Sequence, residues 1–70
     1  MSTKDYDALV VEARRGAYII WIAMEGREVE VSYRPTDSRE TAVLEAGLLQ
    51  RSMLVVTVDS GVLIRGVRLR

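Results

Sequence analysis

A strict two-residue alternation between residues 27 and 34 constrains the fold of this chain more than any other feature. Apolar and polar side chains alternate there, as in a strand with one face against a core and the other in water. The apolar positions are Val29, Val31 and Tyr33. Pro35 ends the strand because it cannot donate to a sheet ladder. The carboxylates of Glu28 and Glu30 therefore belong to a solvated strand face rather than to acid–base chemistry.

A second pair of strands is indicated near the end of the chain, where residues 53–58 and 62–69 are rich in β-branched and aliphatic side chains. The Asp-Ser-Gly tripeptide at 59–61 separates them, so we expect a β-hairpin. The second strand of this hairpin has two apolar pairs, which are Val62 with Ile64 and Val67 with Leu69. In a regular strand these two pairs would lie on opposite faces. One extra residue resets the register, and we therefore predict a β-bulge at Arg65-Gly66.

The first 25 residues carry apolar side chains at steps of three and four, which is the spacing of one helix face. These side chains are Tyr6, Leu9, Val10, Ala13, Ala17, Ile20, Trp21 and Met24. We favour one long or slightly broken helix from about Thr3 to Glu25. Gly16 leaves an alternative open, because glycine is unfavourable inside a helix and common just past its end. In that alternative a helix ends at Arg15 and residues 18–24 form a buried strand.

Residues 39–51 support two interpretations. Asp37 followed by Glu40 three residues later has the form of a helix start, and the alanines and leucines that follow are good helix formers. Gly47, however, stands in the middle of the segment. Its apolar residues also alternate as in a strand, at Ala42, Leu44, Ala46 and Leu48. Helix and strand both remain open for this segment.

Size and composition predict one domain, over residues 1–70, that associates with itself. The chain is 49% hydrophobic, with a mean hydropathy of +0.07. A domain of about 60 residues buries only about 60% of its unfolded surface, so we expect the remaining apolar surface to be covered in a homodimer. The longest apolar run, residues 17–24, is far shorter than the roughly 20 residues of a membrane span. With an acidic rather than apolar N-terminal stretch, we expect a cytoplasmic protein without a membrane segment.

The residue inventory argues against catalysis. The chain has no histidine and no cysteine, which excludes histidine-activated nucleophiles, disulfides and a zinc cage built from these residues. Its five glycines are scattered singly, so they form neither a phosphate-cradling loop nor a dinucleotide-binding motif. We therefore expect a non-enzymatic protein with no catalytic residue, no metal site and no cofactor.

Charge is unevenly distributed along the chain. Residues 1–45 hold six basic and nine acidic side chains, a formal charge of −3, whereas residues 46–70 hold four basic and one acidic, a charge of +3. A basic segment can attract phosphate, although arginines also belong on the wet face of an antiparallel strand. Flat aromatic rings and planar guanidinium groups suit nucleobases and phosphates, and the chain offers Tyr18, Trp21, Tyr33, Arg34, Arg65 and Arg68.

Several segments resemble parts of the WYL domain. Residues 23–34 are similar to the junction of its helix with a first strand ending in tyrosine, and residues 45–49 to the segment before its middle strand. Residues 53–55 fall where its Trp-Tyr-Leu triplet stands, and residues 64–69 are similar to its closing Arg-x-Phe-Arg-Leu strand. The resemblance implies an Sm-like small β-barrel preceded by a helix, found in bacterial and phage-related transcription regulators. It also implies recognition of nucleotide-like or nucleic-acid ligands, or a role in association.

We therefore expect a fold of the α+β class, mainly β, with a helix over residues 1–25 followed by a small antiparallel β-barrel over residues 27–70. The alternative architecture is an αββαββ two-layer sandwich with a second helix over residues 37–51. Either one is compatible with the functions considered next.

The expected function is that of a regulatory module that binds a nucleotide-type ligand or single-stranded nucleic acid. The residues that match the WYL pattern and line this site are Tyr33, Arg34, Arg65 and Arg68. The alternative is a protein-interaction protein, an assembly factor or an inhibitor, that covers a partner with its apolar segment. The interface residues are then Tyr18, Ile20, Trp21 and Met24.

Overall fold

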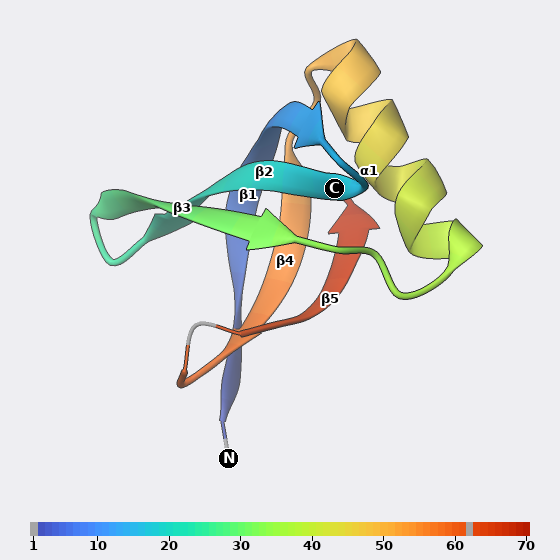
Figure 1. The fold of residues 1–70 in the computed structure, drawn as a ribbon. Helices are drawn as coiled ribbons and strands as arrows, with labels where there is room; N and C mark the ends of the chain where they lie inside the picture. The colour runs from blue at the N-terminus through green and yellow to red at the C-terminus, as the bar shows by residue number, and fades with distance from the viewer. Residues whose placement is uncertain (1, 62) are drawn as a thin grey trace.

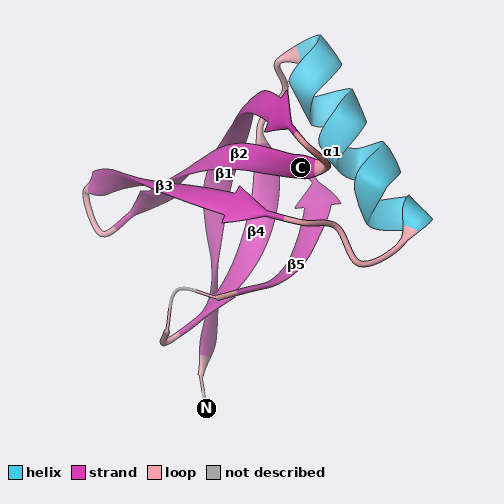
Figure 2. Cartoon of the chain, viewed as in Figure 1, coloured by secondary structure: helices cyan, strands magenta, loops and turns pink. Residues whose placement is uncertain are grey.

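The computed structural model of the chain describes residues 2–61 and 63–70. In this part of the chain one antiparallel sheet of five strands packs against one helix (Figures 1 and 2). The elements are β1 (Thr3–Arg14), β2 (Ala17–Met24), β3 (Arg27–Tyr33), α1 (Ser38–Gln50), β4 (Leu54–Asp59) and β5 (Ile64–Leu69). The strand order in the sheet is β3-β2-β1-β4-β5, so β3 and β5 form its two edges.

The connectivity is that of a Greek key. Strands β1, β2 and β3 follow one another as hairpins, and β4 returns through α1 to lie beside β1. The helix contacts β1 and β5, and it stands along the end of the sheet opposite the N-terminus (Figure 1). The connection between β3 and β4 thus closes one end of the core.

The expected helix over residues 1–25 is wrong, because these residues form β1 and β2. A register shift between Val10 and Glu12 puts an extra residue into β1, and the inward positions on either side of it are then three residues apart. Val10, which is buried, and Ala13, which is exposed at the end of the strand but pairs with buried Tyr18, have this spacing. A bulged strand therefore imitates the period of a helix.

Two tight turns connect the first three strands. Arg15 and Gly16 have φ angles of 53° and 80°, and Glu25 and Gly26 have φ angles of 49° and 82°. Each dipeptide stands between paired strand residues, as in a two-residue type I′ hairpin, which requires positive φ at both positions. Gly16 and Gly26 therefore mark hairpin turns, and of the two alternatives for residues 18–24 the strand is confirmed.

The expected β-barrel over residues 27–70 is also wrong, because the edge strands β3 and β5 do not pair and the sheet stays open. The αββαββ alternative is wrong as well, since three strands precede the single helix of the described residues. Both errors follow from the assignment of a helix to the first 25 residues. That assignment removed two central strands from the sheet.

For residues 39–51 the helix interpretation is confirmed by α1. The Asp37 side chain caps it by accepting a hydrogen bond from the Glu40 backbone N–H at 2.8 Å. The helix ends at Arg51, whose left-handed backbone (φ 52°) directs its N–H to the Gly47 carbonyl. Gly47 is buried, and a Cβ atom there would lie 3.1 Å from the side chain of Leu54 on β4. Glycine in mid-helix thus allows a close approach to the sheet.

The strand over residues 27–34 and the C-terminal hairpin are confirmed as β3, β4 and β5. Along β3 the apolar side chains are half-buried and the glutamates exposed, as the alternation predicts. Thr57 pairs with Gly66 and Val58 with Ile64, so Arg65 is the extra residue of the predicted bulge. Val62, part of the predicted second strand, lies outside the described residues.

The core lies between the inner face of the sheet and α1. Its buried members are Ala8, Val10, Tyr18, Ile20, Ile22, Leu44, Leu54, Val56, Val58 and Val67. Among the residues that the structure describes, five large apolar side chains remain exposed, namely Trp21, Leu49, Met53, Leu63 and Leu69. Within residues 2–61 and 63–70 there is no helix with the length and apolar character that a membrane crossing requires.

Candidate functional site

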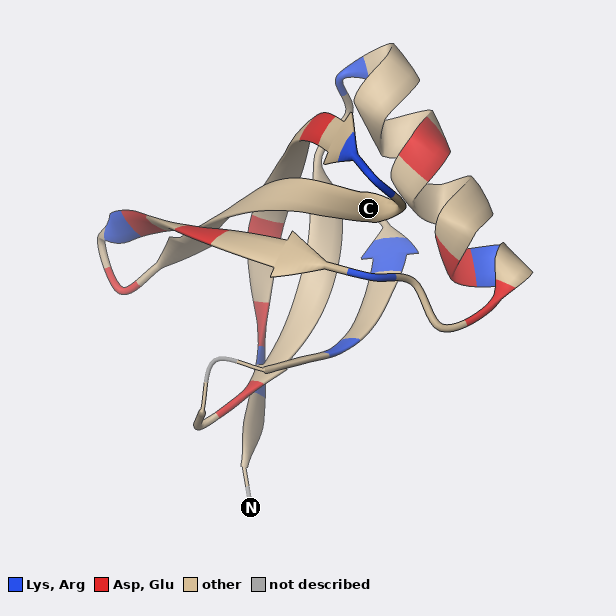
Figure 3. Cartoon of the chain, in the orientation of Figure 1, with Lys and Arg blue, Asp and Glu red and all other residues tan. Residues whose placement is uncertain are grey.

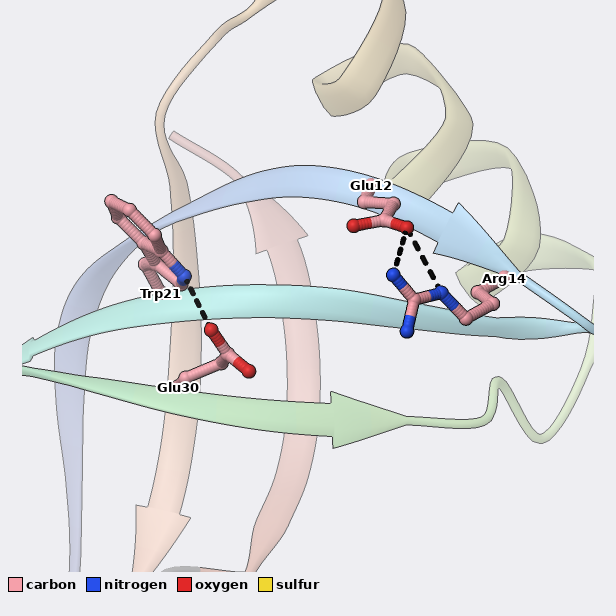
Figure 4. A network of polar contacts seen from close by, with 4 residues as sticks. All are labelled: Glu12, Arg14, Trp21 and Glu30. Carbon is pink, nitrogen blue, oxygen red and sulfur yellow. Dashed lines mark hydrogen bonds and ion pairs between the residues drawn. The ribbon is translucent and has the colours of Figure 1, made fainter.

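Trp21 stands on the outer face of the sheet, directed away from the core. It lies between Leu9 on β1 and Glu30 on β3 in the strand register, and 40% of its surface is exposed. Its indole Nε1 donates a hydrogen bond of 3.1 Å to a Glu30 carboxylate oxygen across the β2–β3 pair (Figure 4). This bond fixes the orientation of the ring while leaving much of it open to a partner.

An open cavity of about 240 Å³ adjoins the indole ring and is lined by Trp21, Glu28 and Glu30. Neither glutamate has an ion-pair partner among the described residues. Ala23, the neighbour of Glu28 on β2, is exposed and small, and leaves room above the sheet. An aromatic ring beside two unpaired carboxylates attracts cations, through the ring quadrupole and through direct charge interaction.

Three other arginines of the outer face are paired with carboxylates. Arg14 contacts Glu12 at 2.6 Å (Figure 4), Arg68 contacts Asp5 at 2.9 Å, and Arg70 is paired with Asp7. Strand β2 lies between these ion pairs and β3, and it has no charged side chain (Figure 3). The net negative charge of this face is therefore concentrated at Glu28 and Glu30.

The first pair of predicted ligand-binding residues lies at the end of β3. The Tyr33 hydroxyl donates a hydrogen bond of 2.7 Å to Glu40 on α1. Burial, this hydrogen bond and the charge of Glu40 raise the pKa of Tyr33 to about 12. Arg34 is exposed and donates a bond of 3.3 Å to the Arg15 carbonyl oxygen. Among the described residues, Arg34 thus has only this weak side-chain bond.

The second pair belongs to β5, at the other edge of the sheet. Arg65 donates to a carboxylate oxygen of Asp59 at 2.9 Å, and Arg68 donates to Asp5 at the same distance. The strand order puts three strands between this pair and the residues at the end of β3. Both guanidinium groups are engaged with carboxylates, which any phosphate would have to displace.

The predicted interface residues divide between the two faces of β2. Tyr18 and Ile20 are buried in the core, and Met24 is half-buried against it. Trp21 alone among these four is exposed. A strand with apolar side chains on both faces places alternate residues inside and outside, so of the four predicted interface residues Trp21 is the one available to a partner.

The association of Trp21 with the two glutamates was not predicted from the sequence, although a signal for it exists. A two-residue turn at Glu25-Gly26 pairs residues at equal distances on either side, which sets Trp21 opposite Glu30. Recognition of this turn requires β2 to be assigned as a strand. With residues 1–25 assigned to a helix, the pairing of Trp21 with Glu30 could not be predicted.

A second cavity, of about 310 Å³, lies near the N-terminus between β1, the β2–β3 turn and the end of β4. The charged side chains that line it, Lys4, Glu25 and Asp59, all have partners. The Tyr6 hydroxyl and the Lys4 ammonium group both contact Glu25, at 3.0 and 3.7 Å, and Asp59 is bonded to Arg65. The Trp21 cavity, with unpaired carboxylates, is the better candidate for a binding site.

The comparisons with known proteins leave the family of this chain open. The chain matches no protein-family model, and it matches neither a curated protein nor a solved structure. The resemblance to the WYL domain stays a prediction.

Proposed function

We propose that this chain is a non-enzymatic protein-interaction module that recognises a segment carrying an arginine or lysine side chain beside apolar residues. The binding surface is the outer face of β2 and β3 around Trp21. The observation that carries the proposal is the cavity lined by Trp21, Glu28 and Glu30, in which an oriented indole ring adjoins carboxylates without an ion-pair partner in the described chain. Tryptophan is the aromatic residue best suited to a cation, and it commonly anchors protein interfaces.

Electrostatics favours a protein segment over nucleic acid at this surface. A phosphate backbone at the Trp21 cavity would approach Glu28 and Glu30, and like charges brought together oppose association. A cationic side chain has the opposite sign, and the apolar neighbours Leu9 and Ile19 extend the contact along the face. The preferred partner is therefore apolar with a basic group.

Binding of a labelled peptide tests the proposal. A fluorescein-labelled peptide of alternating valine and arginine is titrated with dilute protein at low salt, and anisotropy is measured. We expect saturable binding that weakens by at least about tenfold in Trp21→Ala, the loss typical of an interface anchor. Glu28→Gln also weakens it, whereas Arg65→Ala and Arg68→Ala leave it unchanged. The absence of saturable binding, or equal binding of a peptide with citrulline in place of arginine, would refute the proposal.

A second candidate function is recognition of single-stranded nucleic acid or a nucleotide, by a regulatory module of the WYL type, through Tyr33, Arg34, Arg65 and Arg68. The topology favours it, because five-stranded Greek-key folds include the OB-fold, which binds oligonucleotides on its second and third strands. This is an analogy of fold alone. Titration with a short deoxythymidine oligomer distinguishes the two candidates. Saturable binding that is lost in Arg65→Ala and Arg68→Ala but kept in Trp21→Ala would support nucleic acid.

A further inference from the structure

We infer that the β3 edge pairs antiparallel with β3 of a second copy of this chain, so that Arg34 of each copy enters the Trp21 cavity of the other. The inference rests on the proposed function, and it identifies the basic segment as part of the protein itself. It is built from three observations: an unprotected sheet edge, a self-complementary strand sequence, and a cavity that suits a guanidinium group.

The edge formed by β3 carries charged side chains, at Arg27, Glu28 and Glu30, but lacks the other features that usually prevent strands from pairing with other chains. Its seven residues pair regularly with β2, without a bulge, a proline or a lysine. The opposite edge, β5, has a bulge at Arg65 and is shorter. The two-residue turn makes Met24 and Arg27 a hydrogen-bonded pair, and such pairs alternate along the strand. The backbone N–H and C=O groups directed away from β2 therefore belong to every second residue, beginning with Glu28. One edge of the sheet is open to a further strand.

The sequence of β3 is complementary to itself in one antiparallel register. When the two-fold axis passes through Val31, the valine faces its own copy, Val29 faces Tyr33, and Glu30 faces Ser32. Glu28 then faces Arg34, and the symmetry produces this ion pair twice. A register centred on Glu30 sets that carboxylate against itself, and one centred on Ser32 shortens the overlap. The register centred on Val31 avoids the contact between like charges and keeps a longer overlap of the two strands, so it is the favoured one.

This register brings the second copy's arginine to the cavity. Arg34 of the second copy stands beside Glu28, one strand spacing of about 4.8 Å from β3. Its side chain is long enough to lie across β3 toward the indole ring, above the small Ala23. A guanidinium group there contacts carboxylate and aromatic face together, a combination that suits arginine better than lysine. Within residues 2–61 and 63–70 of the single chain, the 3.3 Å bond to the Arg15 carbonyl is the only side-chain hydrogen bond that Arg34 has to give up.

Charge reversal at the two paired positions tests the inference. Solution mass is measured by sedimentation velocity across a concentration series, with circular dichroism as a check of folding. We expect a dimer for the wild type and at least about tenfold weaker association for Glu28→Arg and for Arg34→Glu, since each puts like charges opposite one another twice. The double variant restores the opposite-charge pair and therefore the dimer. Arg39→Glu, the same charge change on the exposed start of α1, leaves the dimer unchanged.

Several outcomes would overturn the inference: a wild type that stays monomeric at high micromolar concentration, single reversals that leave the dimer intact, or a folded double variant that stays monomeric. The peptide titration separates these failures from failure of the proposed function. A monomeric wild type that binds the arginine peptide at Trp21 refutes the strand pairing alone. The opposite result is a wild-type dimer that both reversals weaken, together with a monomeric Arg34→Glu variant that binds no arginine peptide. That result refutes the proposed recognition of other proteins and leaves the strand pairing intact.

Discussion

The hydroxyl of Tyr33 lies 2.7 Å from a carboxylate oxygen of Glu40 and joins the end of β3 to the first turn of α1. The same oxygen accepts hydrogen bonds from the backbone N–H and the hydroxyl of Thr36, both at 2.9 Å. Burial acts to raise the pKa of Glu40, but the bonds from Thr36 and Tyr33 outweigh it and hold that pKa below its usual value. One buried carboxylate thus fixes the connection between sheet and helix.

Removal of the Tyr33 hydroxyl should destabilise the fold. We expect Tyr33→Phe to lower the free energy of unfolding by about 1–2 kcal/mol, because a hydrogen bond to a charged acceptor is lost and Glu40 keeps only its Thr36 donors. Urea denaturation measures the change. Tyr6→Phe is the matched control, since the bond from Tyr6 to Glu25 is exposed. An equal loss in the two variants would contradict the role given to Tyr33.

The same pair predicts a pH dependence at the alkaline end. The pKa of Tyr33 is raised from 10.0 to about 12 in the folded protein, so folding favours the neutral phenol. Its contribution to stability is complete below about pH 10 and is lost as the pH rises through about 12. Urea midpoints measured across this range should fall less steeply in Tyr33→Phe than in the wild type. Parallel curves would show that Tyr33 ionises equally in the folded and unfolded states.

Asp59 predicts a dependence at the acid end. Its carboxylate accepts hydrogen bonds from the backbone N–H groups of Leu63 and Gly61, at 3.1 and 2.9 Å, and from Arg65. The bond from Leu63, with those from Gly61 and Arg65, holds the pKa of Asp59 below its usual value. This stabilisation is present above the unfolded-state pKa of about 4 and is lost as the pH falls through the lower folded value. Thermal midpoints should therefore fall less between about pH 5 and pH 2 in Asp59→Asn, and an unchanged slope would contradict the assignment.

The parts of the fold that could be predicted are those whose pattern is local and regular. The alternation of β3 determines its faces, and the mismatch of apolar positions in the sequence of residues 62–69 predicts the bulge at Arg65. Asp37 and Glu40 mark the start of α1. Gly47 argued against a helix, because the reason for a glycine there is the close approach of Leu54 on β4, a contact between two elements that the sequence does not show.

The first 25 residues were misassigned for two physical reasons. The bulge near Val11 gives β1 the three-residue spacing of a helix face, and β2 is apolar on both faces, so it shows no alternation. The candidate site depends on those strands. The position of Trp21 opposite Glu30 is a property of the β2–β3 register, and it becomes visible only when Glu25-Gly26 is recognised as a hairpin turn.

That turn supplies a further prediction. Gly26 has a φ of 82°, and no atom lies within 4 Å of the position a Cβ would occupy, so alanine there is opposed by backbone strain alone. We expect Gly26→Ala to lower the free energy of unfolding by about 1 kcal/mol. Gly66→Ala, in equally open space without a positive φ, is the control and should change it little. Equal effects in urea denaturation would refute the type I′ assignment.

Gly47 tests how closely α1 packs on the sheet. A Cβ at this position would lie 3.1 Å from both Cδ atoms of Leu54, a fully buried residue of β4. Alanine requires a small shift of that side chain, which its better helix propensity of about 1 kcal/mol can offset. Valine adds two methyl groups in the same place, and we expect Gly47→Val to destabilise the protein by about 1–3 kcal/mol through overpacking.

Ala42→Val is the matched control, because Ala42 is exposed on the same helix and the added methyl groups meet solvent. It should cost only the few tenths of a kcal/mol that a β-branched residue costs a helix. Urea denaturation of the two variants compares them directly. If Gly47→Val is no less stable than Ala42→Val, the helix lies farther from Leu54 than the structure places it. A loss confined to Gly47→Val confirms that this glycine sets the distance between α1 and β4.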